Sequence, residues 1–153
     1  MTIINESMGY SMPSGDRGDC AVRALAIATG RPYDECNALY AKHGRKPNHG
    51  TPRYVTISVH RAIGSLDVRV LHLGRLGQRL VKPARPRYDG LDPRGAYPTR
   101  AQFVKKNPKG RYVLLSRGHA CALVDGVIHD WASRTSGART RVLQALLITE
   151  EMP

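Results

Sequence analysis

The sequence predicts a single domain of the α+β class. Helical patterns fill the first half of the chain and short β-rich segments fill its last third, which differs from the alternation of strands and helices in α/β proteins. The chain has 153 residues, enough for one compact domain, and 41% of them are hydrophobic, enough for an ordinary core. We therefore expect residues 1–153 to form one unit, with helices packed on an antiparallel sheet.

Three helices are expected in the first half. The first has Asp19 as its N-cap, begins at Cys20 and ends at Gly30. The second covers residues 32–43, between a proline suited to a helix start and a glycine suited to a helix end. The segment TPRYVTISVHRAIG (51–64) predicts the third, with a threonine cap followed by proline, although its β-branched residues leave a strand possible.

The middle of the chain is basic and rich in turn-forming residues. DVRVLHL (67–73) predicts a strand, and it is followed by residues 74–100, which contain four prolines, seven Lys or Arg residues and two Asp residues. This composition indicates an irregular excursion within the domain. Thr99 is the expected cap of a short helix, TRAQFVKKN.

The last third predicts a strand at 111–115, a hairpin at 119–131 and a final strand at 141–148. Asp125-Gly126 is a type I′ turn signal between two valines, and a two-residue loop pairs residue 122 with 129. Residues that alternate along such strands share a face. One face then carries His119, Cys121, Leu123, Ile128 and Asp130, and the other carries Ala120, Ala122, Val124, His129 and Trp131.

The formal net charge of +12 predicts attraction to polyanions such as nucleic acid, an acidic protein or an anionic envelope. Nucleic acid could bind through residues 74–100, where Tyr88 and Tyr97 lie among arginines. The same residues could instead form a basic rim that steers an acidic protein substrate, or could simply be a solvated loop.

The three cysteines predict a reducing compartment, because an odd and low count does not suit a disulfide framework. No signal peptide and no stretch of transmembrane length stand out, so we expect a cytoplasmic protein without membrane association. No cofactor is expected. Cys20 and Cys36 lie too far apart for a structural zinc site, so no metal is expected either.

Cys20 is the candidate nucleophile. The N-terminus of a helix carries a partial positive charge and free N–H groups, which stabilise a thiolate and can later hold an oxyanion. Arg23, one turn further, would add to this effect. The alternative is a small buried cysteine at a helix start.

His119 is the candidate base, since a cysteine nucleophile requires a histidine and the histidine requires an orienting group. It follows Gly118 at the start of a strand. In the predicted register Asp130 is its diagonal neighbour, about 7–8 Å away at Cβ, and could orient the ring. The alternatives are a hydrogen-bonded structural histidine and a strand-end acid that faces water.

Two segments carry a family resemblance. GDCAVRALAIATG (18–30) resembles the nucleophile region of papain-like cysteine peptidases, especially small domains from bacterial and phage genomes, and has some likeness to ovarian-tumour-type deubiquitinases. GRYVLLSRGHACALVDGVIHDW (110–131) resembles the histidine and acid strands of the same fold, including the bacteriocin-processing peptidases. The resemblance implies Cys20 as nucleophile, His119 as base and Asp130 as orienting residue. It also implies a bacterial host cytoplasm, or a virion if the protein is phage-encoded.

The oxyanion hole has less obvious candidates. Members of that superfamily usually place a side chain, often glutamine, shortly before the cysteine, whereas this chain has PSGDRGD. The side chains that remain are Ser14, Asp16 and Asp19, with Asn5 more remote. Backbone N–H groups at Cys20 are the alternative.

Three further residues are expected to contact substrate: Gly18, Gly118 and Arg23. The two glycines would leave room for a substrate backbone, or would simply allow turns. These observations together predict a cysteine peptidase or isopeptidase acting on a protein or peptide. A catalytically inactive basic protein that binds nucleic acid or a capsid is one alternative, and a protein deamidase or transglutaminase-type enzyme is another.

Overall fold

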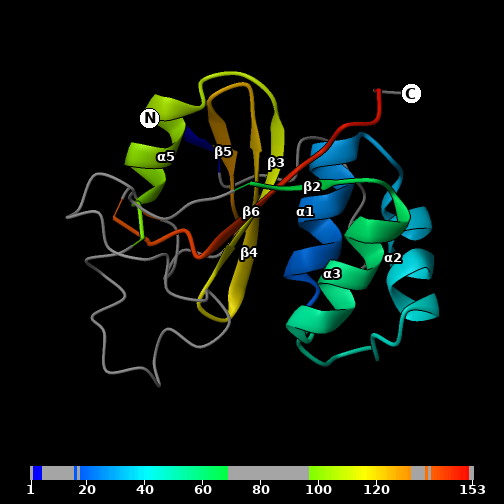
Figure 1. The fold of residues 1–153 in the computed structure, drawn as a ribbon. Helices are drawn as coiled ribbons and strands as arrows, with labels where there is room; N and C mark the ends of the chain where they lie inside the picture. The colour runs from blue at the N-terminus through cyan, green and yellow to red at the C-terminus, as the bar shows by residue number, and fades with distance from the viewer. Residues whose placement is uncertain are drawn as a thin grey trace.

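The architecture is a six-stranded sheet with helices on both faces, seen in a computed structural model (Figure 1). The structure describes residues 2–4, 16, 18–68, 97–131, 137 and 139–151. Its helices are α1 (Cys20–Thr29), α2 (Tyr33–Lys42), α3 (Arg53–Ala62) and α5 (Arg100–Lys106). Its strands are β1 (Thr2–Ile4), β2 (Leu66–Val68), β3 (Arg111–Ser116), β4 (His119–Val124), β5 (Val127–His129) and β6 (Gln144–Leu147). The expected α+β class is confirmed.

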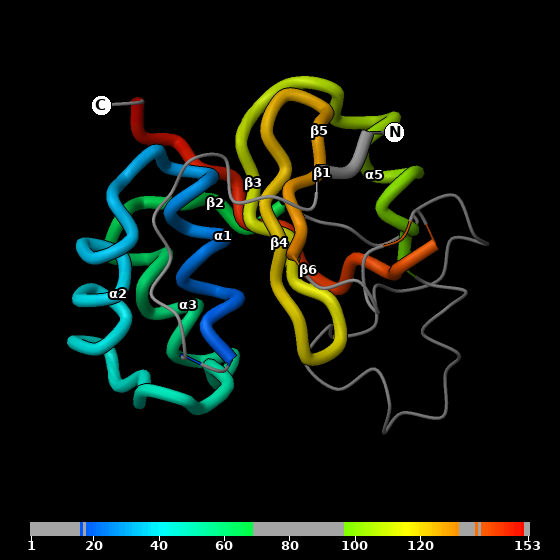
Figure 2. Tube along the Cα trace, turned by 180° about the vertical axis from the view of Figure 1, so that it is seen from behind, coloured from blue at the N-terminus to red at the C-terminus, as the bar shows by residue number. Residues whose placement is uncertain are grey.

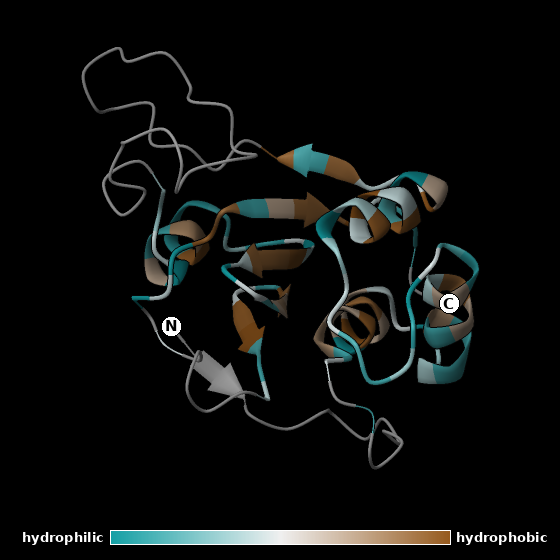
Figure 3. Ribbon diagram, turned by 90° about the horizontal axis from the view of Figure 1, so that it is seen from below, coloured by the Kyte–Doolittle hydropathy of each residue, from teal (hydrophilic) through white to brown (hydrophobic). Residues whose placement is uncertain are grey.

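The strand order is β1-β5-β4-β3-β6-β2, so the β3–β4 hairpin lies at the centre of the sheet. All neighbouring pairs are antiparallel except β1 with β5, which is parallel. Helix α1 lies between the sheet and the α2–α3 pair, and α5 lies on the opposite face (Figure 2). Hydrophobic residues line the central strands between these layers (Figure 3).

Helix α1 is the buried centre of the first layer. Its residues from Ala24 to Thr29 are all buried, because one side faces the sheet and the other faces α2 and α3. Gly30 ends the helix in the left-handed conformation, with φ of 75°, and its N–H bonds the carbonyl of Ala26. The predicted bounds of this helix are confirmed.

The second and third helices also form where the sequence predicts them, and the strand alternative for residues 51–64 is wrong. Each begins one residue later than expected, because Pro32 and Pro52 occupy the N-cap positions in extended conformation. Thr51 therefore is not the cap of α3. The amphipathic spacing of Val55 and Val59, both buried, outweighs the β propensity of this segment.

The hairpin forms with the predicted register. Asp125 and Gly126 both have positive φ, 44° and 84°, as a type I′ turn requires. Residues 122 and 129 pair across it. Cys121 packs with the cluster on the α5 face of the sheet, whereas Ala122 packs with the cluster on the α1 face. Pairing stops at residue 129, so the chain leaves the sheet before Asp130.

Other segments are shorter than expected or lie outside the described residues. The strand predicted at 67–73 is described only as β2, and the strand predicted at 141–148 is confined to β6. Residues 74–96 of the basic excursion, with Tyr88, lie outside the described residues. Tyr97 and Arg100 are buried, with exposed fractions of 1% and 0%, so these two are not part of a solvated basic loop.

Helix α5 begins at Arg100 after a capping box. The Thr99 side chain accepts a hydrogen bond from the backbone N–H of Gln102, and the Gln102 side chain accepts one from the N–H of Thr99. Phe103 fixes the helix to the sheet through an edge-to-face contact with Tyr112. Within the described residues, no helix has the length and apolar character needed to cross a membrane.

Candidate active site

Three elements bring the predicted catalytic residues to one end of the sheet. Cys20 is the first residue of α1, His119 is the first residue of β4, and Asp130 directly follows β5. The layers meet because α1 packs directly on β4, through Ala120 and Ala122. Since β5 runs antiparallel to β4, the end of β5 returns to the start of β4.

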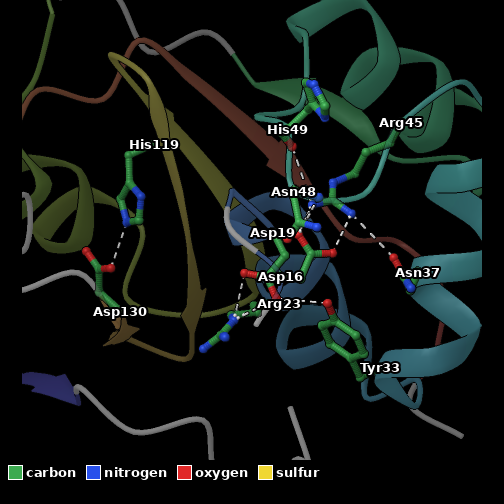
Figure 4. Close-up of polar contacts among 10 residues, drawn as sticks. All are labelled: Asp16, Asp19, Arg23, Tyr33, Asn37, Arg45, Asn48, His49, His119 and Asp130. Atoms are coloured by element: carbon green, nitrogen blue, oxygen red, sulfur yellow. Dashed lines mark hydrogen bonds and ion pairs between the residues drawn. The ribbon is translucent and has the colours of Figure 1, made fainter. Parts of the chain in front are cut away.

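His119 and Asp130 form a short hydrogen bond. The distance between His119 Nε2 and Asp130 Oδ1 is 2.7 Å (Figure 4). The side chain of His119 is 9% exposed and that of Asp130 is fully buried. The predicted diagonal relation therefore produces a direct contact, and the alternative of an acid that faces water is wrong for Asp130.

His119 also interacts with Cys20. Burial alone would lower the pKa of His119, but hydrogen bonds and charges from Asp130 and Cys20 outweigh burial and raise this pKa to about 9. Because Asp130 occupies Nε2, Nδ1 is the ring nitrogen left to exchange a proton with the thiol. At neutral pH the ring is therefore held as an imidazolium beside the cysteine.

Cys20 differs from the other two cysteines in its exposure. It is half-buried, whereas Cys36 and Cys121 are fully buried. Burial raises the pKa of each of these two thiols to about 12, so both stay protonated near neutral pH. Cys20 is thus the one thiol of the chain placed where a reagent or substrate can reach it.

Trp131 lies beside the histidine, which corrects the expectation that it points away. The ring centroids of His119 and Trp131 are 6.0 Å apart, with an angle of 63° between the planes. Trp131 still packs against the cluster that contains Ala120 and Ala122, the residues with which it was predicted to share a face. It reaches His119 because the chain has left the sheet after residue 129, so strict alternation no longer holds.

Arg100 contacts the second oxygen of Asp130, and the sequence analysis did not identify it. The distance between Arg100 Nη1 and Asp130 Oδ2 is 2.7 Å, and both side chains are fully buried. In the sequence Arg100 is one of seven basic residues in a proline-rich segment, and nothing local distinguishes it. The capping signal at Thr99 locates the helix start, but not the partner that its first residue meets.

Asp19 is held by two side chains rather than by the helix N-terminus. It is the N-cap residue, as predicted, but makes no side-chain capping bond. Arg23 Nε lies 3.0 Å from both carboxylate oxygens, and the Tyr33 hydroxyl donates a 2.8 Å hydrogen bond to Oδ2 (Figure 4). Burial, followed by this bond and the negative charge of Asp19, raises the pKa of Tyr33.

Asp16 is fixed in a similar way by the loop between α2 and α3. Arg45 donates two hydrogen bonds to its carboxylate, at 3.1 and 2.8 Å, and the N–H of Asn48 donates a third. These bonds, the one from Arg45 first, lower the pKa of Asp16 despite its burial. The carboxylates of Asp16 and Asp19 therefore both serve as hydrogen-bond acceptors for arginines, and neither is placed as a donor to an oxyanion.

The remaining oxyanion candidates are the backbone N–H groups at the start of α1. The first helical bond is donated by the N–H of Arg23 to the carbonyl of Asp19, so the N–H of Cys20 precedes the hydrogen-bonded turns. Ser14 and Asn5 lie outside the described residues. Backbone donors at Cys20 thus have the right chemistry and location.

The two candidate substrate-contact glycines have different surroundings. Gly18 has a φ of 85°, and a Cβ there would lie 2.9 Å from the backbone N of Gly50, so this glycine allows the segment before Cys20 to touch the α2–α3 loop. Gly118 has a φ of 67° in the turn before His119, with no atom within 4 Å of an added Cβ. Gly118 therefore leaves open space beside the histidine, whereas Gly18 does not.

Arg23 is partly exposed, at 22% of its side chain, and contacts Asp19 through Nε.

Within the described residues, no group of three or more His, Cys, Asp or Glu side chains could hold a metal ion. A scan against protein-family models and searches of curated proteins and of solved structures found no match. The chemistry of the site therefore rests on its own geometry.

Proposed function

We propose that this protein is a cysteine hydrolase that cleaves amide bonds with Cys20 as nucleophile, His119 as base and Asp130 as orienting residue. The observation that carries the proposal is the position of His119. It bonds a fully buried carboxylate on one side and interacts with a half-buried thiol at a helix N-terminus on the other.

The protonation states fit this chemistry. The raised pKa of His119 favours an imidazolium at neutral pH, which in turn favours the thiolate of Cys20 as its counter-charge. The thiolate attacks the acyl carbon, and His119 donates its proton to the leaving amine as the C–N bond breaks. Water then gives a proton to His119, attacks the thioester and releases the acid and the thiol.

The fold supports a papain-like arrangement as part of the same proposal. In such an arrangement a helix supplies the cysteine and an antiparallel sheet packed on it supplies the histidine and the acid. Here α1 and the β4–β5 hairpin have these roles, in the chain order cysteine, histidine, acid. The N–H groups at the start of α1 would hold the oxyanion.

The net charge of +12 favours an acidic protein or peptide as substrate. Nucleic-acid binding through residues 74–100 has less support, because Tyr97 is buried and cannot stack on a base.

The decisive experiment is the pH profile of iodoacetamide alkylation at each cysteine, read by mass spectrometry. We expect rapid labelling of Cys20 near pH 5–6, about 2–3 pH units below the free-thiol range. Cys36 and Cys121 serve as internal controls in the same spectra and should stay unlabelled while the protein is folded.

Two variants make this test specific. His119→Ala should slow labelling of Cys20 at low pH, because the imidazolium is lost. His43→Ala is the matched control, since His43 lies at the C-terminal end of α2 and bonds Ser58. Labelling of Cys20 only above about pH 8, unaffected by His119→Ala, would exclude the hydrolase and leave the basic surface as the function to pursue.

A further inference from the structure

We propose that Arg100 is a positioning residue of this site, whose guanidinium keeps Asp130 ionised and correctly oriented while His119 gives up and regains its proton. The inference rests on the proposed function and extends the triad by one residue, which lies 30 positions before the acid in the chain.

The geometry gives each oxygen of Asp130 its own partner. Oδ1 accepts from His119 Nε2 and Oδ2 accepts from Arg100 Nη1, both at 2.7 Å. A carboxylate held at both oxygens cannot rotate about its terminal bond without losing one of these contacts. Arg100 thereby fixes the plane of the Asp130 carboxylate, and this carboxylate in turn fixes the plane of the His119 imidazole.

Burial makes a permanent cation necessary here. Arg100 and Asp130 are both 0% exposed, and an isolated carboxylate in such a place would take up a proton rather than stay charged. His119 cannot be the permanent counter-charge, because it becomes neutral each time it protonates a leaving group. A guanidinium stays protonated throughout, so Asp130 remains an anion in both states of His119.

The backbone holds Arg100 in place without using its side chain. Its N–H donates to the carbonyl of Thr140, Thr99 pairs with Arg141 in an isolated bridge, and the capping box fixes the first turn of α5. The guanidinium is therefore delivered to Asp130 by two chain segments that both lie outside the α1 layer.

Burying the positive charge of Arg100 costs free energy, which a purely structural contact would not require. Within the described part of the chain, buried Nε and Nη2 of Arg100 have no hydrogen-bond partner. An apolar side chain of similar size often replaces a buried ion pair without loss of stability. A fully buried arginine with only one of its nitrogens bonded is better explained by what its charge does to Asp130 and His119 than by fold stability.

The test is the pH profile of Cys20 alkylation in Arg100→Met, Arg100→Lys and the wild type. Loss of a permanent positive charge raises the proton affinity of the groups around it, so Arg100→Met should move the midpoint to higher pH by about one unit or more. Arg100→Lys keeps the charge and should stay close to the wild type. Arg31→Met is the matched control, because Arg31 pairs with Glu150 away from the site.

An NMR titration of the His119 ring gives an independent measure. In Arg100→Met, Asp130 takes up a proton and no longer supplies the negative charge that raises the pKa of His119, so the midpoint of the ring titration should fall. If Arg100→Met does not fold, Arg100→Gln replaces it, since glutamine is neutral but can still bond Asp130. A folded neutral variant with the wild-type midpoint would overturn the proposal, and so would failure of both neutral variants to fold. An ordinary-thiol profile in the wild type itself would instead remove the proposed function.

Discussion

The hydroxyl group of Tyr33 donates a hydrogen bond to Asp19, the residue directly before Cys20, and joins the start of α2 to the start of α1. Asp19 is 5% exposed and Tyr33 is 3% exposed, so this bond lies in the interior. It holds the first turn of α1 in place from outside the helix, because Asp19 makes no side-chain capping bond of its own.

Tyr33→Phe removes this bond and leaves Asp19, among the described residues, with its contact to Arg23. A buried hydrogen bond to a charged group contributes about 1.5–3 kcal/mol, so the free energy of unfolding should fall by about that amount. Urea denaturation measures the change. Tyr54→Phe is the control, because Tyr54 is 74% exposed, and it should leave stability unchanged. Equal stability of the two variants would contradict a role for the Tyr33–Asp19 bond.

Gly18→Ala should destabilise the segment before Cys20. The added Cβ would lie 2.9 Å from the backbone N of Gly50, and alanine at a φ of 85° is itself strained. We expect a loss above the roughly 1–2 kcal/mol that left-handed backbone costs by itself. Gly118→Ala is the matched comparison, since it has a similar φ and open space around it. If thermal or urea unfolding gives the two variants the same loss, the contact with Gly50 is unimportant.

The ion pair of His119 should stabilise the fold at neutral pH and lose its effect at high pH. Its pKa is raised from an ordinary 6.5 to about 9 in the folded state, so the folded protein binds the proton more tightly than the unfolded chain. This contribution is fully present below about pH 6.5 and is lost as the pH rises through about 9. The free energy of unfolding of the wild type minus that of His119→Gln should therefore decline between pH 6.5 and 9.5. If this difference in the free energy of unfolding does not change over the range, the ion pair of His119 does not stabilise the fold.

His60 should make the fold sensitive to acid. Burial lowers the pKa of His60 to about 4, and its Nδ1 lies 2.9 Å from Ser65 Oγ. The folded state keeps the ring neutral while the unfolded chain takes up a proton below about pH 6.5, so stability falls between pH 6.5 and 4. At about 1.4 kcal/mol per pH unit, His60→Gln should remove about 2–3 kcal/mol of the decline between pH 6.5 and 4.5. Urea denaturation at the two pH values measures the decline, and an equal decline in both proteins would contradict this origin.

Features set by neighbouring residues could be predicted from the sequence. The aspartate and glycine around residues 19–30 bound α1, and Asp125-Gly126 sets the register of the hairpin. That register is enough to bring His119 and Asp130 together, because cross-strand position follows from counting residues back from a turn. Local chemistry therefore located the candidate base and its acid.

Features set by packing could not be predicted in this way. The contact of Arg100 with Asp130 depends on how α5 docks on the far face of the sheet, and the contact of Trp131 with His119 depends on where strand pairing ends. The position of Pro52 at the start of α3 also depends on packing. Its φ suits either the N-cap or the first turn, and only the packed helix shows which position it takes.

Alanine side chains in the core set the distance between the helix that carries Cys20 and the strand that carries His119. Helix α1 packs on β4, and the core cluster that they share is rich in alanines, among them Ala24 and Ala28 of the helix and Ala120 and Ala122 of the strand. The thiol belongs to one layer and the imidazole to the other, so the thickness of this alanine contact sets their separation. One additional methyl group between the layers would change the distance between Cys20 and His119 without altering either side chain. The small alanine side chains between the two layers therefore control how closely Cys20 and His119 approach each other.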